Sequence, residues 1–456
     1  MENKNNKNCP YISTIKRYLL DFDLEKKCSI SLSTLNIYCC LICGKYFQGR
    51  GKNSYAFTHS IQQDHHLFIN LSDTNIYCLP EDYIVNDNLL NDIKLNLKPF
   101  YNENDIKNLD FICEYCYSLE GNKFLPGFIG LNNIKNNDYF NVVIQAFCHL
   151  KKFRNYFIKF KLIKDKKNDE DVFLEKLSDL FKKIWNKFNF KEHISPYEIL
   201  HVMFNLFNKN KNDEDKINEN KKINCALFLT WFINIIKNTL NNNKIVENII
   251  NMYFTGKLEL ETFKLLKDKK YKLKSNEKII TLKEDQMEYI YTKNKINFHY
   301  LTLELPHTPL FKDKNEKINI PQININKLLE KYNGKNIVYE PNKETKKRYK
   351  IIKLPFYLIL IFKRFENNMF FVEKNSTLIN FTLDNLIINN IKYSLNSNII
   401  HEGKPNQGNY KIQIKNKCLN EWFEIQDLNI QKIFSESVLM SESYIQFYEQ
   451  IQEKYK

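Results

Sequence analysis

Hydrophobic and polar residues alternate with different periods in the two halves of the chain. In the first half, apolar residues recur at helical spacing over residues 171–188 and again over 224–237, and each pattern predicts a helix. Between these segments, Ser195, Pro196 and Glu198 have the spacing of a capping box at a helix start. Beyond about residue 290, short apolar runs predict strands: FHYLTLEL, YLILIFKRF, TLINFTL and YKIQIK. Helices followed by strands indicate an α+β fold.

Changes in composition divide the chain into segments. Residues 1–100 are rich in Cys and His, whereas residues 101–126 are mixed and irregular and are predicted to be a linker. From residue 127 to residue 456 the helical and then strand-like patterns continue and predict one larger domain. Within that domain, residues 208–222 read NKNKNDEDKINENKK, a polar low-complexity stretch that predicts a disordered insertion.

Composition and charge exclude several classes of protein. The chain is 43% apolar, enough for a large core, and its longest apolar run, Leu354–Phe362, is shorter than the ~20 residues of a membrane-spanning helix. The first residues contain no apolar segment of a secretory signal, so we expect an intracellular protein without a membrane. The net charge of +15 comes almost entirely from Lys, with only five Arg. Such basicity is typical of a solvated surface, with a polyanion-facing surface as the alternative.

The cysteine pattern indicates a metal site. Six of the 11 Cys fall within the first 78 residues, and an odd total in an intracellular protein argues against a disulfide framework. Cys40 and Cys43 form a C-x₂-C knuckle, and His59 and His65 follow 16 and 22 residues after Cys43. Two thiolates and two imidazoles are a closed tetrahedral ligand set for a structural Zn²⁺. The spacing leaves His66 open as the alternative to His65, and buried structural Cys with surface His as the alternative to a metal.

Five motifs around this knuckle resemble the UBP-type zinc finger: CPY (9–11), CSIS (28–31), YCCLICGKYFQGR (38–50), YAFTHSIQQDHH (55–66) and YCLPEDY (77–83). Fuller members of that family bind up to three zincs. Here five of the family's ligand positions are substituted, by Tyr11, Ser31, Gln48, Tyr55 and Glu81. Only the set Cys40, Cys43, His59 and His65 is complete, so we predict one structural zinc. Ubiquitin-binding members hold the C-terminal tail of ubiquitin through an Arg and aromatic residues. The resemblance therefore makes Arg50 and Tyr77 candidates for contact with a ubiquitin tail.

The second domain resembles the ubiquitin-specific proteases over residues 127–456. The motifs that carry the resemblance are GLNNIKNNDYFNVVIQAF (130–147), NCALFLTWFIN (224–234), FHYLTLELP (298–306), LPFYLILIFKRF (354–365), YSLNSNIIHEGKPNQGNYKI (393–412) and WFEIQDL (422–428). It implies a papain-like fold of thumb, palm and fingers. It also places Asp138 at the nucleophile position, Asn409 at the position of the catalytic His, and Gln426 at that of the orienting Asp. Asn133 matches the residue that steadies the oxyanion.

These substitutions remove the groups that hydrolysis needs. A carboxylate is a poor nucleophile toward an amide, and the Asn409 amide cannot exchange a proton near neutral pH. No replacement is evident: Cys148 lies ten residues along the same predicted helix, roughly 15 Å from Asp138. His401 is near Asn409 in sequence but has no thiol beside it, and the lone pair Cys113 and Cys116 is a weak metal or redox signal. We therefore expect a pseudoenzyme.

A degenerate finger joined to a protease-like domain with all three triad positions substituted resembles the snRNP-assembly-defective family, the inactive protease-like proteins of the spliceosomal tri-snRNP. The resemblance implies a nuclear scaffold or assembly factor that binds tri-snRNP proteins during pre-mRNA splicing. Independently of the resemblance, the Lys-rich loops are candidates for contact with snRNA phosphates. Two alternatives stay open. One is an adaptor that binds ubiquitin or a ubiquitin-like fold weakly, and the other is a working deubiquitinating peptidase.

Overall fold

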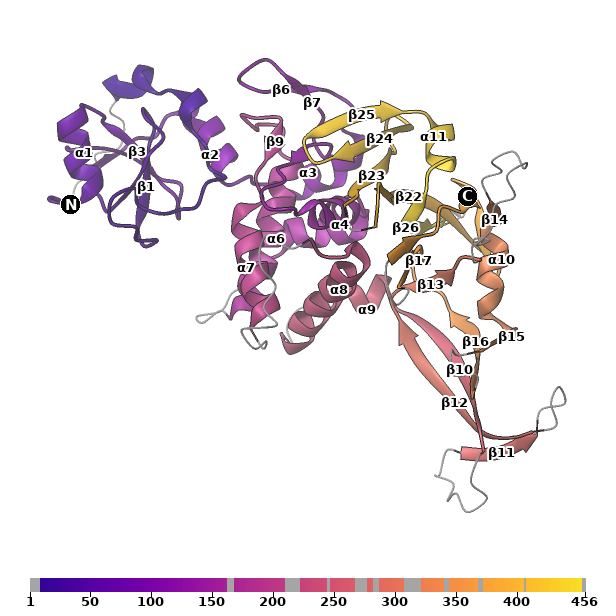
Figure 1. The fold of residues 1–456 in the computed structure, drawn as a ribbon. Helices are drawn as coiled ribbons and strands as arrows, with labels where there is room; N and C mark the ends of the chain where they lie inside the picture. Colours follow the sequence, from indigo (N-terminus) through magenta and orange to yellow (C-terminus); the bar gives the residue numbers. More distant parts are fainter. Residues whose placement is uncertain are drawn as a thin grey trace.

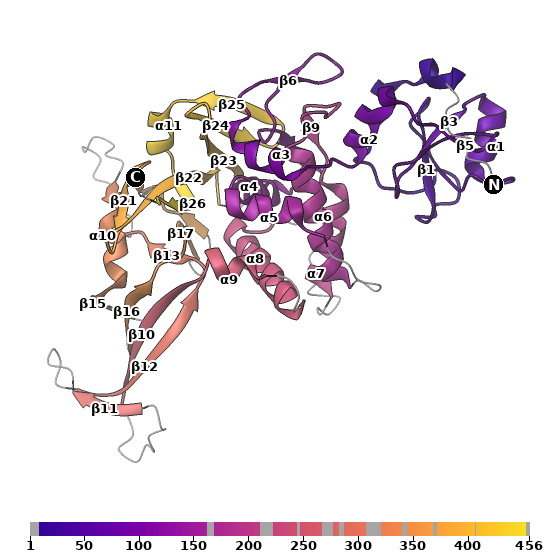
Figure 2. The same ribbon diagram turned by 180° about the vertical axis from the view of Figure 1, so that it is seen from behind.

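The structure is a computed structural model of the 456-residue chain. It describes residues 9–161, 168–209, 222–243, 247–266, 277–281, 287–306, 321–339, 344–367, 372–405 and 407–452. Figures 1 and 2 show an N-terminal module beside a larger hand-shaped part. The hand consists of a helical thumb, a palm built on a large sheet, and a long sheet that projects from the palm as fingers. No helix among the described residues has both the length and the apolar character needed to cross a bilayer.

The N-terminal module is a five-stranded antiparallel sheet in the order β2-β1-β3-β4-β5. Its elements are η1 (Pro10–Thr14), η2 (Arg17–Leu19), β1 (Ile37–Cys40), β2 (Tyr46–Gln48), α1 (Tyr55–Gln63), β3 (Leu67–Asn70), β4 (Ile76–Cys78), β5 (Tyr83–Ile84), η3 (Asn88–Leu90) and α2 (Asn91–Leu97). The turn between β1 and β2 requires Gly44, which has φ +75° and on which a Cβ would collide with the carbonyl oxygen of Leu19. This turn carries the C-x₂-C knuckle.

The segment predicted to be a linker is folded onto the hand. Residues 101–126 form α3 (Glu103–Asn108), η4 (Leu109–Phe111), β6 (Cys116–Tyr117) and β7 (Lys123–Phe124). Leu109 and Phe124 belong to the same hydrophobic core as the thumb. Asp110 accepts a hydrogen bond from the buried guanidinium of Arg154 at 2.7 Å and pairs with Lys151 at 2.6 Å. Apolar burial and a partly buried ion pair therefore make this segment part of the larger domain.

The thumb is a cluster of helices with a core rich in Phe (Figure 1). Its elements are β8 (Gly130–Leu131), α4 (Asp138–Cys148), α5 (Lys151–Lys159), α6 (Asp169–Ile184), β9 (His193–Ile194), α7 (Tyr197–Asn208), α8 (Cys225–Asn242) and α9 (Ile249–Tyr253). The helices predicted over 171–188 and 224–237 correspond to α6 and α8. The capping box predicted at Ser195 is wrong, because α7 begins at Tyr197 after Pro196 and has no side-chain cap. Most of the predicted disordered insertion, residues 210–221, lies outside the described residues.

Two sheets make up the palm and the fingers. The palm sheet has the order β13-β17-β26-β22-β23-β24-β25, with β21 beside β22, and the fingers sheet has the order β11-β12-β10-β16-β15. The fingers strands are β10 (Gly256–Leu265), β11 (Glu277–Thr281), β12 (Glu288–Phe298), β15 (Asn333–Tyr339) and β16 (Thr345–Lys353). The palm strands are β13 (Leu301–Glu304), β17 (Tyr357–Lys363), β21 (Leu386–Ile388), β22 (Ile391–Glu402), β23 (Asn409–Asn416), β24 (Glu421–Gln426), β25 (Asn429–Ile433) and β26 (Ser443–Gln450). The remaining elements are β14 (Gln322–Asn324), α10 (Ile325–Leu329), η6 (Glu330–Tyr332), β18 (Phe365–Asn367), β19 (Val372–Lys374), β20 (Leu378–Asn380) and α11 (Ser435–Leu439).

Ion pairs join the N-terminal module to the thumb. Asp23 accepts a hydrogen bond from Lys183 Nζ at 2.6 Å and from the backbone N–H of Ser195 at 3.0 Å. Asp21 pairs with Lys191 at 2.7 Å, and Phe190 of the thumb belongs to the hydrophobic core of the N-terminal module. Burial lowers the pKa of Lys183, but the neighbouring Asp23 carboxylate outweighs it, so the pKa of this lysine is raised. The module is therefore docked through one ion pair that is largely shielded from solvent, Asp23–Lys183, and one that is more exposed, Asp21–Lys191.

Candidate functional site

The structure brings Cys40, Cys43, His59 and His65 together, with their ligand atoms all within 4.8 Å of one another. Cys40 Sγ lies 3.5 Å from His65 Nδ1, Cys43 Sγ lies 3.4 Å from His59 Nε2, and the two imidazole nitrogens are 3.1 Å apart. A tetrahedral Zn²⁺ with ordinary bond lengths requires S···N separations of about 3.5 Å and N···N separations of about 3.3 Å. Both the donor types and their spacing therefore fit one zinc ion, which would have four protein ligands and a structural role.

Secondary structure positions these ligands. Cys40 ends β1, Cys43 lies in the Gly44 turn, His59 lies on α1, and His65 precedes β3. Burial lowers the pKa of His59, which favours the neutral imidazole that a metal needs. His66 lies elsewhere: its Nδ1 contacts the Leu79 carbonyl oxygen at 2.7 Å, and its Nε2 contacts Asp64 at 2.8 Å.

The substituted positions of the family's other zinc sites do not form a ligand cluster. The Cys28 sulfur accepts hydrogen bonds from the backbone N–H groups of Ser31 and Gln48 at 3.4 and 3.3 Å. The Ser31 hydroxyl donates a hydrogen bond to Gln48 Oε1 at 2.8 Å. At another of these sites, Cys78 Sγ lies 3.6 Å from Glu81. Among the described residues, the Cys40 group is the only set of three or more such side chains with metal-binding geometry.

Arg50 lies against the aromatic residue that the sequence pairs with it. Its guanidinium carbon is 4.4 Å from the centre of the Tyr77 ring, and it forms an ion pair with Asp82. The candidate contact for a ubiquitin tail is thus already engaged with a carboxylate of the same module.

The residue at the nucleophile position is buried and fully bonded. Asp138 begins α4 and is 1% exposed. Its Oδ1 accepts a hydrogen bond from the backbone N–H of Tyr139 at 2.9 Å, and its Oδ2 accepts one from the backbone N–H of Tyr410 at 2.9 Å. The positive end of the α4 dipole further stabilises the carboxylate. This carboxylate therefore serves as a hydrogen-bond acceptor that links α4 to β23.

A lysine that the sequence motifs do not mark completes this centre. Lys222 Nζ lies 2.6 Å from Asp138 Oδ2, 3.3 Å from Asn409 Oδ1, and also donates to the carbonyl oxygen of Gly408. Asp138 and Asn409, the substitutes for nucleophile and base, are therefore bound to the same ammonium group. With its charge neutralised, the Asp138 carboxylate is a still weaker nucleophile, and Asn409 has no proton to transfer.

The other two predicted positions differ in their contacts. Asn133 Nδ2 donates to Asp427 Oδ2 at 3.0 Å, and Asn141 of α4 donates to the other oxygen of the same carboxylate at 2.9 Å. Gln426 ends β24, opposite Asn429 of β25. The acidic side chain that holds the start of α4 is therefore Asp427, one residue beyond the position predicted from the motif.

A thiol and an imidazole lie near this centre, and burial favours the neutral form of each. Cys225 is fully buried, its Sγ is 3.9 Å from the Tyr139 carbonyl oxygen, and burial together with the Asp138 carboxylate raises its pKa well above the ordinary value. Burial, with the nearby Lys374 and Lys222, lowers the pKa of His401 to about 4. A neutral thiol and an imidazole held in its neutral form do not make an ion-pair nucleophile at neutral pH.

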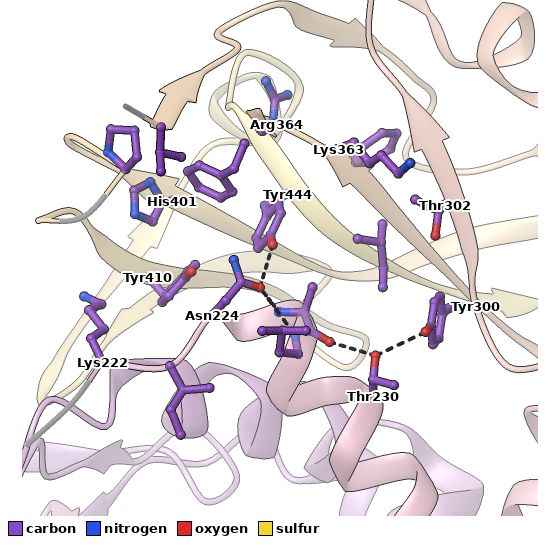
Figure 3. A pocket seen from close by; sticks show the side chains of 18 residues that line it. Lys222, Asn224, Thr230, Tyr300, Thr302, Lys363, Arg364, His401, Tyr410 and Tyr444 are labelled. Carbon is purple, nitrogen blue, oxygen red and sulfur yellow. Dashed lines mark hydrogen bonds between the residues drawn. The ribbon is translucent and has the colours of Figure 1, made fainter. Parts of the chain in front are cut away.

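A cavity of about 800 Å³ opens beside the Asp138 centre, between α8 and the palm (Figure 3). Lys222, His401 and Tyr410 line one end of it, and Tyr300 and Thr302 line the other. Its wall includes a chain of hydrogen bonds in which Tyr444 donates to Asn224, the N-cap residue of α8. The cavity is therefore lined by ordered polar and aromatic side chains.

Comparison with protein families assigns both parts of the chain. The model described as ubiquitin carboxyl-terminal hydrolase matches residues 129–448, which is more than half of the chain. The model described as the Zn-finger in ubiquitin-hydrolases and other protein matches residues 28–90. The chain belongs to the ubiquitin carboxyl-terminal hydrolase family. The predicted fold class, a UBP-type zinc finger followed by a papain-like domain with thumb, palm and fingers, is confirmed.

Several relatives in this family match the chain over almost its whole length. "Ubiquitin carboxyl-terminal hydrolase 39" of Homo sapiens is 40% identical over 98% of this chain and 80% of its own length. "Probable mRNA-splicing protein ubp10" of Schizosaccharomyces pombe is 37% identical over 96% and 88%, and "Pre-mRNA-splicing factor SAD1" of Saccharomyces cerevisiae is 31% identical over 97% and 93%. The crystal structure of an essential yeast splicing factor superposes with a TM-score of 0.74 at 30% identity and covers 97% of this chain and 100% of that chain.

Sequence reasoning missed three features of this family member. Lys222 follows a low-complexity stretch and belongs to no motif, so its role was detectable only from the contacts. Asp427 directly follows Gln426, the residue that the motif places at the position of the orienting Asp. Cys113 pairs with Cys418 as a disulfide across a separation of 305 residues, with a Cα–Cα distance of 6.1 Å, where the sequence predicted no disulfide and weighed only the local Cys113/Cys116 pair.

Proposed function

We propose that this chain is a non-catalytic scaffold or assembly factor of the spliceosomal tri-snRNP, acting in pre-mRNA splicing in the nucleus. Relatives that match the chain nearly end to end carry splicing names, and the similar yeast structure is that of a splicing factor. Partners of this function are tri-snRNP proteins. One structural Zn²⁺, held by Cys40, Cys43, His59 and His65, stabilises the finger.

The observation that carries the non-catalytic part of the proposal is the ion pair between Asp138 and Lys222. The carboxylate that replaces the nucleophile accepts two backbone N–H groups and one ammonium, which leaves it bonded from three directions. General acid–base assistance contributes ~10²–10⁴-fold to enzymatic rates, and Asn409 supplies none. Loss of the nucleophile and of the base together removes both halves of the mechanism.

The proposal is tested in two arms with the full chain. A tagged chain is purified from nuclear extract, and the co-purifying proteins are identified by mass spectrometry. We expect tri-snRNP proteins, and their absence would contradict the scaffold function. In the second arm, a fluorogenic ubiquitin-amide reporter should be cleaved no faster than in buffer. Cleavage by protein of verified sequence would favour the peptidase alternative.

A single substitution sharpens the second arm. Asp138→Cys restores a thiol at the helix start, but Asn409 still provides no base, so we expect no reporter cleavage by this variant. Turnover by Asp138→Cys alone would refute this account of the centre. Titration with free ubiquitin tests the adaptor alternative, in which a ubiquitin tail would compete with Asp82 for Arg50.

A further inference from the structure

Among the sheets of the described residues, the fingers sheet carries the largest positive charge. Its five strands hold 11 Lys and Arg against four Asp and Glu, so that 42 residues carry almost half of the net charge of +15. Both views show this sheet projecting away from the palm (Figures 1 and 2). The sequence predicted RNA contact through Lys-rich loops, and the Lys-rich segment 267–276 beside this sheet lies outside the described residues.

Strand register places most of this charge on one side of the sheet. Glu259 of β10 lies between Lys295 of β12 and Lys350 of β16, and Glu261 lies between Lys293 and Arg348. Directly paired residues of neighbouring antiparallel strands point to the same face. We call this side the basic face, and its members are Lys257, Glu259, Glu261, Lys293, Lys295, Arg348, Lys350 and Lys353.

Two of the basic residues neutralise the two glutamates. Lys293 Nζ lies 2.9 Å from Glu259 and 3.6 Å from Glu261, and Arg348 donates to Glu261 at 3.0 Å. The other four, Lys257, Lys295, Lys350 and Lys353, are exposed and form no ion pair with any described residue. Neighbouring strands are ~4.8 Å apart, and alternate residues on one strand are ~7 Å apart. The four free ammonium groups therefore form a compact array on a rigid support.

The composition of this array distinguishes between two kinds of acidic partner. Protein interfaces are depleted in Lys and Glu and need buried apolar or aromatic anchors. Phe263, Tyr291 and Tyr339 lie further along the same side of the sheet. Arg348 lies over the Phe263 ring, Lys346 lies over the Tyr339 ring, and the Tyr291 hydroxyl donates to Glu261, so these aromatic residues are already engaged within the sheet. A nucleic-acid backbone needs only positively charged groups placed to meet phosphates, a contact that lysine makes as a point charge. The single arginine is already bound to Glu261, so the face is suited to phosphates and not to reading bases.

We propose that the basic face of the fingers sheet binds the phosphate backbone of RNA without sequence preference. This inference deepens the proposed splicing function, because it assigns a surface through which the chain contacts the RNA of the particle. The contact is electrostatic, and its four principal groups are Lys257, Lys295, Lys350 and Lys353.

The test measures the affinity of the purified full chain for a fluorescein-labelled 20-nucleotide oligouridine at several salt concentrations. The face variant changes Lys257, Lys295, Lys350 and Lys353 to Gln. Each single-strand phosphate contact contributes about −0.7 to the slope of log K against log salt, so four contacts should make the wild-type slope steeper than the variant's by about 3. Between 50 and 200 mM salt, the wild type should therefore lose about 50-fold more affinity than the variant.

A matched control removes the same charge elsewhere. Lys52, Lys107, Lys264 and Lys327 are exposed and form no ion pair with any described residue, and Lys264 lies on β10 but on the other side of the sheet. Their change to Gln should leave affinity and slope within about twofold of wild type. Equal losses in both quadruple variants, or none in the face variant, would overturn the proposal. So would competition by a poly-glutamate peptide as strong as that by RNA, which would indicate an acidic protein partner.

A second measurement does not depend on folding of the variants. Wild-type protein is photo-crosslinked to 4-thiouridine RNA, and mass spectrometry should find the crosslinks in peptides that contain 257, 293–295 or 350–353. Crosslinks confined to other peptides would overturn the inference. These assays use purified protein, so they can fail while splicing proteins still co-purify with the chain. Conversely, the scaffold proposal can fail while RNA still binds the basic face.

Discussion

Removing the ammonium of Lys222 should weaken the connection between α4 and β23 far more than the loss of an ordinary surface ion pair. The side chain of Lys222 is 27% exposed, whereas the side chain of its partner Asp138 is only 2% exposed. Leaving one member of a buried pair without its partner costs about 3–5 kcal/mol. Two backbone N–H groups still donate to the Asp138 carboxylate, and Lys222 is partly solvated. We therefore expect Lys222→Met to destabilise the contact between α4 and β23 by about 2–3 kcal/mol.

The assay is hydrogen exchange of the Tyr410 amide, which donates directly to Asp138. If this amide exchanges through local opening of the β22–β23 turn, a loss of about 2–3 kcal/mol accelerates its exchange about 30- to 150-fold. The matched control is Lys209→Met, because Lys209 pairs with Asp169 at 3.3 Å with the two side chains 50% and 61% exposed. Such a surface pair contributes at most about 1 kcal/mol, and its loss should not affect the Tyr410 amide.

A double variant tests whether the charges of Asp138 and Lys222 interact. Asp138→Asn in the Lys222→Met background removes the uncompensated negative charge, so the Tyr410 amide should exchange more slowly than in Lys222→Met alone. This reversal is expected only if the two charges interact. If Lys222→Met accelerates exchange by less than about threefold, or if the double variant is additive, Asp138 is not held by the lysine as described here.

Three further predictions concern other parts of the molecule. Metal analysis of the purified chain should find one zinc per molecule. Cys43→Ser should abolish zinc binding and reduce the protection of the N-terminal sheet in hydrogen exchange. Two or three ions per molecule would contradict the single site. Asp23→Asn should remove the partner of Lys183 and weaken the docking of the N-terminal module on the thumb. The radius of gyration in small-angle scattering should then increase while the zinc content stays unchanged. An unchanged radius would mean that the remaining contacts are enough to dock the module. Burial lowers the pKa of His149 to about 4, below its unfolded value of ~6.5. The contribution of this histidine to the free energy of unfolding should therefore be complete above pH ~6.5, and the free energy should fall by up to about 3 kcal/mol as the pH drops toward 4. His149→Phe should flatten the dependence of the unfolding midpoint between pH 7 and 5, and an equal dependence in both proteins would exclude this histidine.

The sequence was most informative where a function needs a short, fixed spacing. The C-x₂-C knuckle and the two following histidines predicted a ligand set that the structure brings within bonding distance of a single ion. The ordered motifs of the second domain likewise predicted the family and its fold. Such signals are readable because the residues are close in sequence or belong to a motif with a defined order.

Features that depend on distant parts of the chain were not readable in this way. The capping box expected at Ser195 fails because its backbone N–H is taken by Asp23 of the finger, and Glu198 pairs with Lys26 and Lys176 instead of bonding back to the helix start. Tertiary charge pairs thus overrode a local preference. The predicted linker had no strong periodicity, because its packing against the thumb depends on a few apolar residues such as Leu109.

The centre lacks a thiol nucleophile at Asp138 and an imidazole at Asn409 but keeps the architecture that joins α4 to β23. The start of α4 and the N–H of Tyr410 form a pocket of backbone donors that favours a negative charge. Asp138 places a permanent carboxylate in that pocket, and Lys222 supplies the matching positive charge from the start of α8. The positions of the nucleophile and the base are thereby occupied by two partners of one lysine, Asp138 and Asn409. The cleft then joins thumb to palm through a fixed ionic contact, which suits a protein whose proposed role depends on holding a shape.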